Sequence, residues 1–274
     1  MTQSLNVFER APLRLASRAS QLAMCQAELV KGKLAPIATE IQPITTHGDR
    51  VLDRSLADAG GKGLFIKELE KAILAGESDA AIHSMKDMET NFAPGTEIAA
   101  VLPREDRRDA LLGGYESLAD LPQGAVIGTS SVRRRALLLH HRPDFQIKLL
   151  RGNVIRRIGL LEAGGYDAII LAVAGLKRLG LDIAYTPLSS EEMPTAAAQG
   201  ALSVQIASPT NERTRSVSAA FAKMNCPIAT AEVTAERAVL AHLDGSCHTP
   251  IAASAIYSDD GVISLDAMIL CPNG

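Results

Sequence analysis

Short apolar runs alternate with helix-forming stretches over most of the chain, and this alternation is the strongest constraint on its fold. The short runs predict strands, and the longer stretches with apolar residues three or four positions apart predict helices. The predicted strands are residues 13–16, 40–45, 79–83, 125–127, 147–150 and 168–172, and the predicted helices are residues 21–34, 64–74, 134–140 and 154–163. This pattern is typical of an α/β fold with mainly parallel sheets, in which ligands bind at the carboxyl ends of strands.

The alternation is interrupted at two places. Residues 103–109 form a proline-marked, charged connection between the two series of elements. A second break lies near residues 186–194. The strand predicted for residues 200–207 and the helix predicted for residues 214–224 then return the chain to the first series.

Pro227 begins a third segment. We expect a helix over residues 232–243 and antiparallel strands over residues 251–257 and 262–270, joined by a turn at residues 259–261. The predicted domains are residues 1–102 with 197–224 (domain 1), residues 103–196 (domain 2) and residues 225–274 (domain 3).

Composition narrows the class of ligand. The 274 residues are 47% hydrophobic and 22% charged, which indicates a soluble globular protein. A net charge of -3, nine aromatic residues and no tryptophan argue against a general nucleic-acid or membrane-surface binder. The arginine clusters are therefore local features that suit a small anion.

The N-terminus and the spacing of the cysteines indicate the compartment of the protein and the state of its thiols. The first twelve residues lack the apolar core of a signal peptide, and no later run approaches the length of a membrane span, so we expect a cytoplasmic protein. The four cysteines include no C-x-x-C pair, so neither a zinc site nor a disulfide framework is indicated, and free thiols are expected.

An anion site is predicted where the strand at 125–127 passes into a helix. Thr129 and Ser131 suit a helix N-cap, and Arg133 and Arg134 follow in the first turn with Arg135. Amide and guanidinium groups there would converge on a multidentate anion. The alternative is that the arginines form a solvated helix face.

A second strand end repeats this arrangement. Arg151 ends the strand at 147–150, Gly152 and Asn153 form a turn, and Arg156 and Arg157 open the next helix. Two basic strand ends in one predicted domain favour a shared binding role over two solvated faces.

Three further segments could carry chemistry. The strand at 79–83 runs into Lys86 and Asp87, which could supply a general acid or a counter-ion, or could be an ordinary surface pair. Residues 60–65 form a glycine-rich turn that opens a helix but lack a full phosphate-loop pattern. Cys247, beside His248 in a tight loop, is either a reactive thiol or an inert packing residue.

Taken together, these segments resemble the porphobilinogen deaminases, also called hydroxymethylbilane synthases. The resemblance runs from Leu13 to the C-terminus. It rests on seven ordered matches: residues 13–18 (LRLASR), 60–65 (GGKGLF), 83–87 (HSMKD), 128–134 (GTSSVRR), 150–154 (LRGNV), 172–178 (AVAGLKR) and the Cys247 loop.

The resemblance implies a transferase of tetrapyrrole biosynthesis. Such enzymes join four porphobilinogen molecules head to tail with loss of ammonia and release hydroxymethylbilane. Cys247 matches the cysteine that holds the dipyrromethane primer through a thioether, and Asp87 matches the catalytic carboxylate. A carboxylate beside the positively charged pyrrole intermediates would stabilise them.

The resemblance also implies which residues contact carboxylates, because each pyrrole carries an acetate and a propionate that guanidinium groups bind in pairs. The residues implied to bind the cofactor are Cys247, which would hold it through the thioether, and Lys86, Thr129, Ser131, Arg133, Arg134, Arg151 and Gly152. For the substrate they are Arg18, Ser20, Arg157, Arg178, Gln26, Lys62 and Gln199. Arg135 and Arg156 are expected to be surface charges.

The fold that the resemblance implies has two periplasmic-binding-protein-like domains with mainly parallel sheets and a small α+β third domain that carries the cofactor cysteine. Four positions depart from the family pattern: Asp58, Met88-Glu89, Gln205 and His248-Thr249. Members of the family continue beyond the position of Gly274, so we expect domain 3 to be short at its C-terminus.

Two other function classes remain open from sequence. A non-catalytic anion-binding protein could use the same two-domain cleft, but it would need neither Cys247 nor Asp87. A nucleic-acid-binding regulator is disfavoured by the charge and the low aromatic content. We expect a monomer whose partner is the small molecule porphobilinogen, with no nucleic acid, membrane or metal ion.

Overall fold

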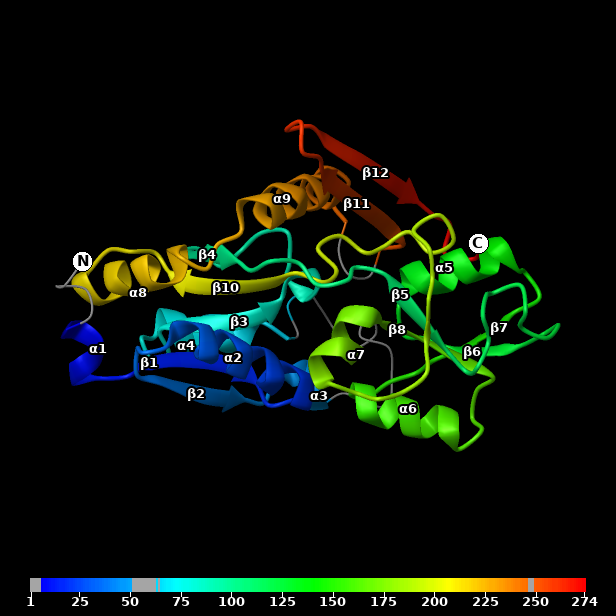
Figure 1. Cartoon of the computed structure of the whole chain (residues 1–274), viewed down its shortest axis with the longest axis horizontal. Coiled ribbons are helices and arrows are strands. Elements are labelled where there is room, and N and C mark those ends of the chain that lie inside the picture. Colours follow the sequence, from blue (N-terminus) through cyan, green and yellow to red (C-terminus); the bar gives the residue numbers. More distant parts are fainter. Residues whose placement is uncertain (1–5, 51–62, 64, 246–248) are drawn as a thin grey trace. The chain divides into compact units, whose positions relative to one another are not determined.

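The computed structural model describes residues 6–50, 63, 65–245 and 249–274 (Figure 1). The chain divides into two compact units. Unit 1 contains the described residues of 1–50, 62–104 and 201–231, and unit 2 contains residues 105–200 and the described residues of 232–274.

Unit 1 is built on a five-stranded sheet of order β2-β1-β3-β10-β4. Its strands are β1 (Leu13–Arg18), β2 (Thr39–Ile44), β3 (Ala80–Ser84), β4 (Thr96–Val101) and β10 (Leu202–Ala207). The pairs β1–β2 and β1–β3 are parallel, whereas β10 runs antiparallel to both β3 and β4. Four strands therefore share one direction, and only β10, which enters from the second break in the pattern, opposes them.

Helices cover both faces of this sheet. They are α2 (Gln21–Leu34), α4 (Lys67–Leu74) and α8 (Glu212–Ala222), with the short α1 (Asn6–Arg10) and α3 (His47–Arg50) and the 3-10 turn η1 (Met85–Asp87). Ser20 caps α2 by accepting a hydrogen bond from the Ala23 amide. Since Val30 and Phe221 share one apolar cluster and Leu69 belongs to another, α2 and α8 lie on one face and α4 on the other.

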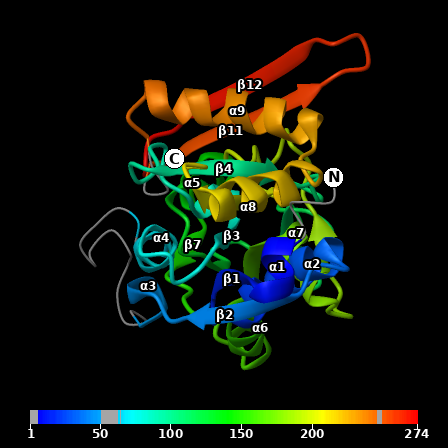
Figure 2. The same cartoon turned by 90° about the vertical axis from the view of Figure 1, so that its left-hand side faces the viewer.

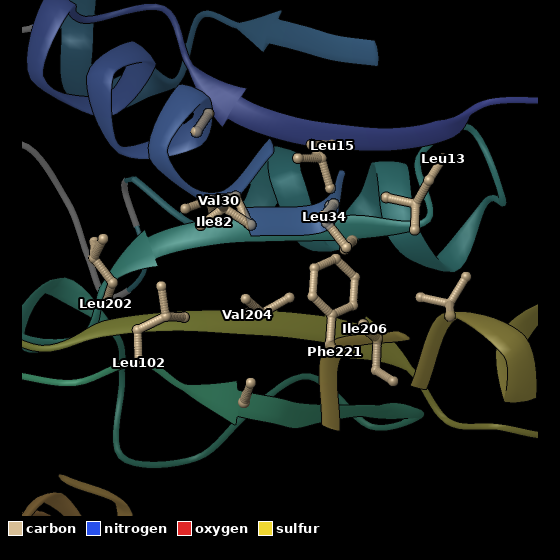
Figure 3. Packing of buried hydrophobic residues seen from close by; sticks show 14 of the residues in the cluster. Leu13, Leu15, Val30, Leu34, Ile82, Leu102, Leu202, Val204, Ile206 and Phe221 are labelled. Carbon is tan, nitrogen blue, oxygen red and sulfur yellow. The ribbon is translucent and has the colours of Figure 1, made fainter. Parts of the chain in front are cut away.

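Phe221 is the largest fully buried side chain of unit 1. Figure 3 shows its ring beside Ile206 and directed toward Leu34, so that α8, β10 and α2 meet around it. Leu13 and Leu15 complete the contact from β1.

Unit 2 repeats the plan with a sheet of order β7-β6-β8-β5-β9. Its strands are β5 (Asp109–Leu112), β6 (Val126–Gly128), β7 (Gln146–Lys148), β8 (Ala168–Ala172) and β9 (Thr186–Pro187). Here β5 is the reversed strand, antiparallel to β8 and β9, while β6 is parallel to β7 and β8. In each sheet, therefore, the strand that opposes the others is the one that follows a break in the sequence pattern.

The helices of unit 2 begin at capped strand ends. They are α5 (Val132–His141), α6 (Val154–Glu162) and α7 (Val173–Leu179). Ser131 caps α5 and Asn153 caps α6, each accepting a backbone amide of the first turn. Helix α5 packs on one face of the sheet, whereas α6 and α7 pack on the other.

The C-terminal segment consists of helix α9 (Pro227–His242) and a hairpin of β11 (Ile251–Tyr257) and β12 (Ile263–Ile269). The two strands pair antiparallel, and the turn between them places Gly261 at a φ of 86°. Figure 2 shows α9 along the hairpin. Glu236 of α9 is fully buried and accepts hydrogen bonds from the amides of Ala198 and Ala255. These bonds link the hairpin to the connection at residues 195–200.

The fold class predicted from sequence is confirmed: two sheets with mainly parallel strands and a small C-terminal α+β segment. One prediction is wrong in part. The sequence places 103–109 wholly in a charged connection, whereas Asp109 begins β5 and is fully buried, because two arginines neutralise it. No local pattern predicts α1, α3, β4, β5, α7 or β9, which the structure adds.

We expect Phe221→Ala to lower the free energy of unfolding by about 3 to 5 kcal/mol, because it removes the buried ring around which α8, β10 and α2 pack. Urea unfolding measures this value. The exposed Ile228 on α9 provides a control, since Ile228→Ala should change stability by less than about 0.5 kcal/mol. Equal effects of the two substitutions would contradict the assigned core.

Candidate functional site

Asp87 lies at the carboxyl end of the central strand of unit 1. The buried strand β3 continues into η1, whose start is fixed by a hydrogen bond from the Met85 amide to the Ala201 carbonyl (3.0 Å). This short turn leaves the side chains of Lys86 and Asp87 half-buried at the sheet edge where ligands of α/β folds bind.

Arg18 ends the neighbouring strand β1 and approaches Asp87. Its Nη1 lies 4.0 Å from Asp87 Oδ2, and its guanidinium carbon lies 4.0 Å from the centre of the Phe65 ring. The aromatic face holds the guanidinium in place beside the carboxylate. Arg18, Phe65 and Asp87 line one small pocket of unit 1.

Gln26 lines the same pocket from helix α2. Its Nε2 donates to Ser84 Oγ (2.9 Å), which links the helix to the end of β3. Ser20, at the N-cap of α2, is half-buried, and its hydroxyl oxygen accepts a hydrogen bond from the Ala23 amide.

His83 supports this pocket from within the sheet. Burial lowers its pKa to about 4, since the imidazolium form would lose its hydration. Its Nε2 has no hydrogen-bond partner within the part of the chain that the structure describes. His83 is therefore a neutral, buried wall of the pocket at physiological pH.

Gln205 explains one departure from the family pattern. Its Nε2 donates to Glu70 Oε1 (2.9 Å) and Thr96 Oγ1 (2.8 Å) in a buried position of β10. A glutamate there would set a second carboxylate against Glu70, so glutamine fits this neighbour better.

In unit 2, strand β6 passes into helix α5 through Thr129, Ser130 and Ser131. Thr129 Oγ1 accepts the Ser131 amide (3.1 Å), and Ser131 Oγ accepts the Arg134 amide (3.4 Å). These bonds fix the first turn of α5 and direct the side chains of Arg133 and Arg134 into the unit, where both are buried.

The two guanidinium groups share one carboxylate. Arg133 Nη2 donates to Asp109 Oδ2 (2.6 Å), and Arg134 Nη2 donates to Oδ1 (2.7 Å). Gln199 Nε2 adds a third bond to Oδ1 (2.8 Å). Burial alone would raise the pKa of Asp109, but the two guanidinium groups hold it well below its ordinary value.

This cluster fits an anionic ligand. Two buried guanidinium charges face one carboxylate, which leaves one positive charge in excess among these three side chains. The Nε of Arg133 and of Arg134 are buried and have no hydrogen-bond partner in the described residues. An uncompensated buried cation is costly, so a carboxylate on a ligand would stabilise this arrangement.

The second basic strand end forms a separate turn. Asn153 caps α6, and Arg157 Nε donates to the Gly152 carbonyl (2.8 Å). Gly152 has a φ of 110°, and a Cβ there would lie 2.7 Å from Arg156 Cδ, so the turn requires glycine. Arg151 is half-buried at the start of this turn.

Helix α7 carries Arg178, which is half-buried. Its Nη2 donates to the Gly200 carbonyl (2.6 Å), and the neighbouring Lys177 pairs with Glu105. Both partners belong to the connections between the units. Arg135 and Arg156 are exposed, as predicted.

The structure brings six of the predicted site residues together in two sets and leaves the other described ones apart from them. In unit 1, Arg18, Gln26 and Asp87 line one pocket. In unit 2, Arg133, Arg134 and Gln199 converge on Asp109. The predicted residues Lys62 and Cys247 lie outside the described residues.

Sequence analysis missed Asp109, Phe65 and His83 as parts of the site. Only Asp109 had a signal: a single acidic residue opening the apolar run Asp109–Leu112 needs a buried cationic partner. The ring of Phe65 against Arg18 and the burial of His83 depend on packing that no local pattern reveals.

The sequence matches two family models in order along the chain. Residues 13–215 match "Porphobilinogen deaminase, dipyromethane cofactor binding domain", and residues 230–274 match "Porphobilinogen deaminase, C-terminal domain". The chain belongs to the porphobilinogen deaminase family. The sequence-based assignment to this family, its transferase reaction and its dipyrromethane cofactor is thereby confirmed.

Curated relatives agree with this membership. A porphobilinogen deaminase of Thiobacillus denitrificans is 47% identical over 96% of this chain and 86% of its own length. One of Phenylobacterium zucineum is 45% identical over 96% of this chain and 85% of its length. Among solved structures, an ancestral cationic amino acid solute binding protein is 14% identical with a TM-score of 0.47, covering 81% of this chain and 93% of its own.

The described residues show neither a metal cluster nor a membrane span. Within the described ranges, no group of three or more histidine, cysteine, aspartate or glutamate side chains could hold a metal ion. No described helix is long and apolar enough to span a membrane. Cys25 and Cys226 are half-buried free thiols, and Cys271 is an exposed one.

His83 should make stability fall in acid. Its pKa is about 4 in the folded protein and 6.5 when unfolded, so only the unfolded state gains a proton as the pH falls between these values. At about 1.4 kcal/mol per pH unit, the loss is on the order of 3 kcal/mol across the window.

Urea unfolding of the protein and of a His83→Gln variant at about pH 7, 5.5 and 4.5 measures this loss. The variant should lose stability less steeply than the protein. The exposed His242 provides a control, and a His242→Gln variant should keep the full slope. Parallel slopes for the protein and His83→Gln would contradict the burial of a neutral His83.

Proposed function

We propose that this chain joins four porphobilinogen molecules head to tail, with loss of ammonia at each step, on a dipyrromethane primer attached to Cys247, and then releases hydroxymethylbilane. The observation that carries the proposal is the pairing of Asp87 with Arg18 at the strand ends of unit 1 in a chain that belongs to the deaminase family. A simple anion binder would need no carboxylate at that place.

The cofactor supplies a nucleophilic pyrrole carbon on which the product chain grows. Its own carboxylates would be held by Arg133, Arg134 and Arg151, with Lys86 and the amides and hydroxyls around Thr129, Ser131 and Gly152. Two observations support this assignment: the excess positive charge beside Asp109, and the Nε groups of Arg133 and Arg134, which have no hydrogen-bond partner among the described residues. Forked guanidinium donors suit carboxylates better than ammonium groups do.

Asp87 acts on the incoming substrate. Positive charge develops on the pyrrole as the C–N bond of its aminomethyl group breaks and ammonia leaves, and a carboxylate fixed nearby stabilises that charge. The same side chain can hand a proton to the departing amine. Arg18, whose Nη1 lies 4.0 Å from Asp87 Oδ2, orients the carboxylate, and its guanidinium group suits a substrate acetate or propionate.

The remaining residues with a proposed substrate role are Ser20, Gln26, Lys62, Arg157, Arg178 and Gln199. Gln26 supports its assignment by lining the Asp87 pocket. Arg157 and Arg178 are half-buried and each donates to a backbone carbonyl, which restrains the guanidinium planes.

We further propose that the protein acts in the cytoplasm as a monomer, without nucleic acid or membrane partners. The net charge of -3 and the scarcity of aromatic residues support the absence of nucleic-acid and membrane partners. The division into domain 1 (1–102 and 197–224), domain 2 (103–196) and domain 3 (225–274) also remains a proposal.

Asp87→Asn should keep the covalent cofactor but lower kcat for hydroxymethylbilane formation about 10²- to 10⁴-fold, because the amide can neither carry the negative charge nor donate the same proton. Product formation from porphobilinogen and intact mass measure the two effects. Asp182→Asn, at an exposed position of unit 2, should leave both unchanged. Normal turnover by Asp87→Asn would overturn the catalytic role.

A further inference from the structure

Among the side chains that the structure describes, two aspartates each bridge two arginines, and their surroundings differ. In unit 1, Asp79 pairs with Arg14 and Arg213, whose side chains are 29% and 27% exposed. In unit 2, Asp109 pairs with Arg133 and Arg134, whose side chains are 4% and 8% exposed. Water can compensate the second positive charge at Asp79, but it reaches the Asp109 cluster far less.

The Asp109 cluster also fixes each guanidinium group in two directions. Arg133 Nη1 donates to the Pro194 carbonyl (2.5 Å), and Arg134 Nη1 donates to the Ile170 carbonyl (2.9 Å), while their Nη2 atoms meet the two oxygens of Asp109. A long side chain with four rotatable bonds is thereby reduced to one orientation.

Gln199 orients the carboxylate in turn. Its Nε2 donates to Asp109 Oδ1 and to the Arg107 carbonyl (2.7 Å), and these two bonds fix the orientation of the amide NH₂ group. The three donors come from α5 and from the connection at residues 195–200, which are distant in sequence from Asp109. The carboxylate is the common point on which they depend.

We propose that Asp109 is a positioning residue that sets Arg133 and Arg134 for the carboxylates of the pyrrole ligand; the inference rests on the proposed function. Asp109 has no need to touch the ligand. Its carboxylate holds the two guanidinium groups side by side and compensates one of their two positive charges. A ligand carboxylate would compensate the other.

An asparagine at this position would break the arrangement without changing its size. It offers one acceptor oxygen and one NH₂ donor where three donors converge. At least one guanidinium group would have to turn away, and the two buried arginines would repel each other. We therefore choose Asp109→Asn as the test and Asp79→Asn as its matched control.

The experiment starts from full-length protein made in cells that produce no porphobilinogen. Porphobilinogen is added at increasing concentration, and intact mass follows the gain of the dipyrromethane adduct. We expect the half-saturating concentration to rise at least about tenfold in Asp109→Asn, the factor that one lost charge-assisted hydrogen bond represents. For Asp79→Asn it should stay within about twofold of the unchanged protein.

Thermal unfolding of the same samples separates positioning from stability, because both variants lose an ion-paired carboxylate. A lower unfolding temperature in both, with a raised half-saturating porphobilinogen concentration only in Asp109→Asn, supports the inference. Loading of Asp109→Asn at the same concentration as the unchanged protein overturns it. If the unchanged protein gains no adduct and forms no hydroxymethylbilane, the proposed function itself fails.

Gln199→Met keeps the test decisive if Asp109→Asn does not fold. This substitution removes one donor to Asp109 without altering any charge. We expect a rise of about threefold or more in the half-saturating porphobilinogen concentration, because the loss of a hydrogen bond from an uncharged amide corresponds to at least roughly that factor. An unchanged concentration would contradict the positioning role.

Discussion

The shared ion pair of Asp109 with Arg133 and Arg134 is the interaction on which unit 2 depends. It joins the start of β5 to the first turn of α5, and Gln199 extends it to the connection at residues 195–200. Buried charges are tolerated only when they are paired and hydrogen-bonded. The same bonds that satisfy these charges therefore also fix the orientation of the guanidinium groups that a carboxylate ligand would meet.

The acidic side chain at the end of β3 and the arginines of unit 2 have different proposed roles. In unit 1, a carboxylate at the end of β3 stands beside Arg18 and can stabilise a cation that forms during reaction. In unit 2, arginines at helix starts and strand ends can hold the carboxylates of the pyrroles. A chain with a net charge of -3 thus presents locally cationic binding groups while remaining acidic overall.

The sequence alone predicts those helices and strands whose ends are marked by nearby residues. Helix α2 and the strands β8 and β11 have the predicted bounds, since a serine cap, an apolar run or a glycine turn marks their ends. Strand β5 was missed because charged residues precede it, and the role of Asp109 was missed because its partners lie 24, 25 and 90 residues away. The site arginines were found from strand ends and caps, but their burial follows from tertiary packing alone.

The central claim is that these arginines serve a polycarboxylate cofactor anchored at Cys247. Intact mass of the purified protein, followed by peptide mapping, tests it most directly. The account predicts a dipyrromethane-sized increase carried by the peptide that contains Cys247. A protein that forms hydroxymethylbilane from porphobilinogen while its Cys247 peptide stays unmodified would contradict it.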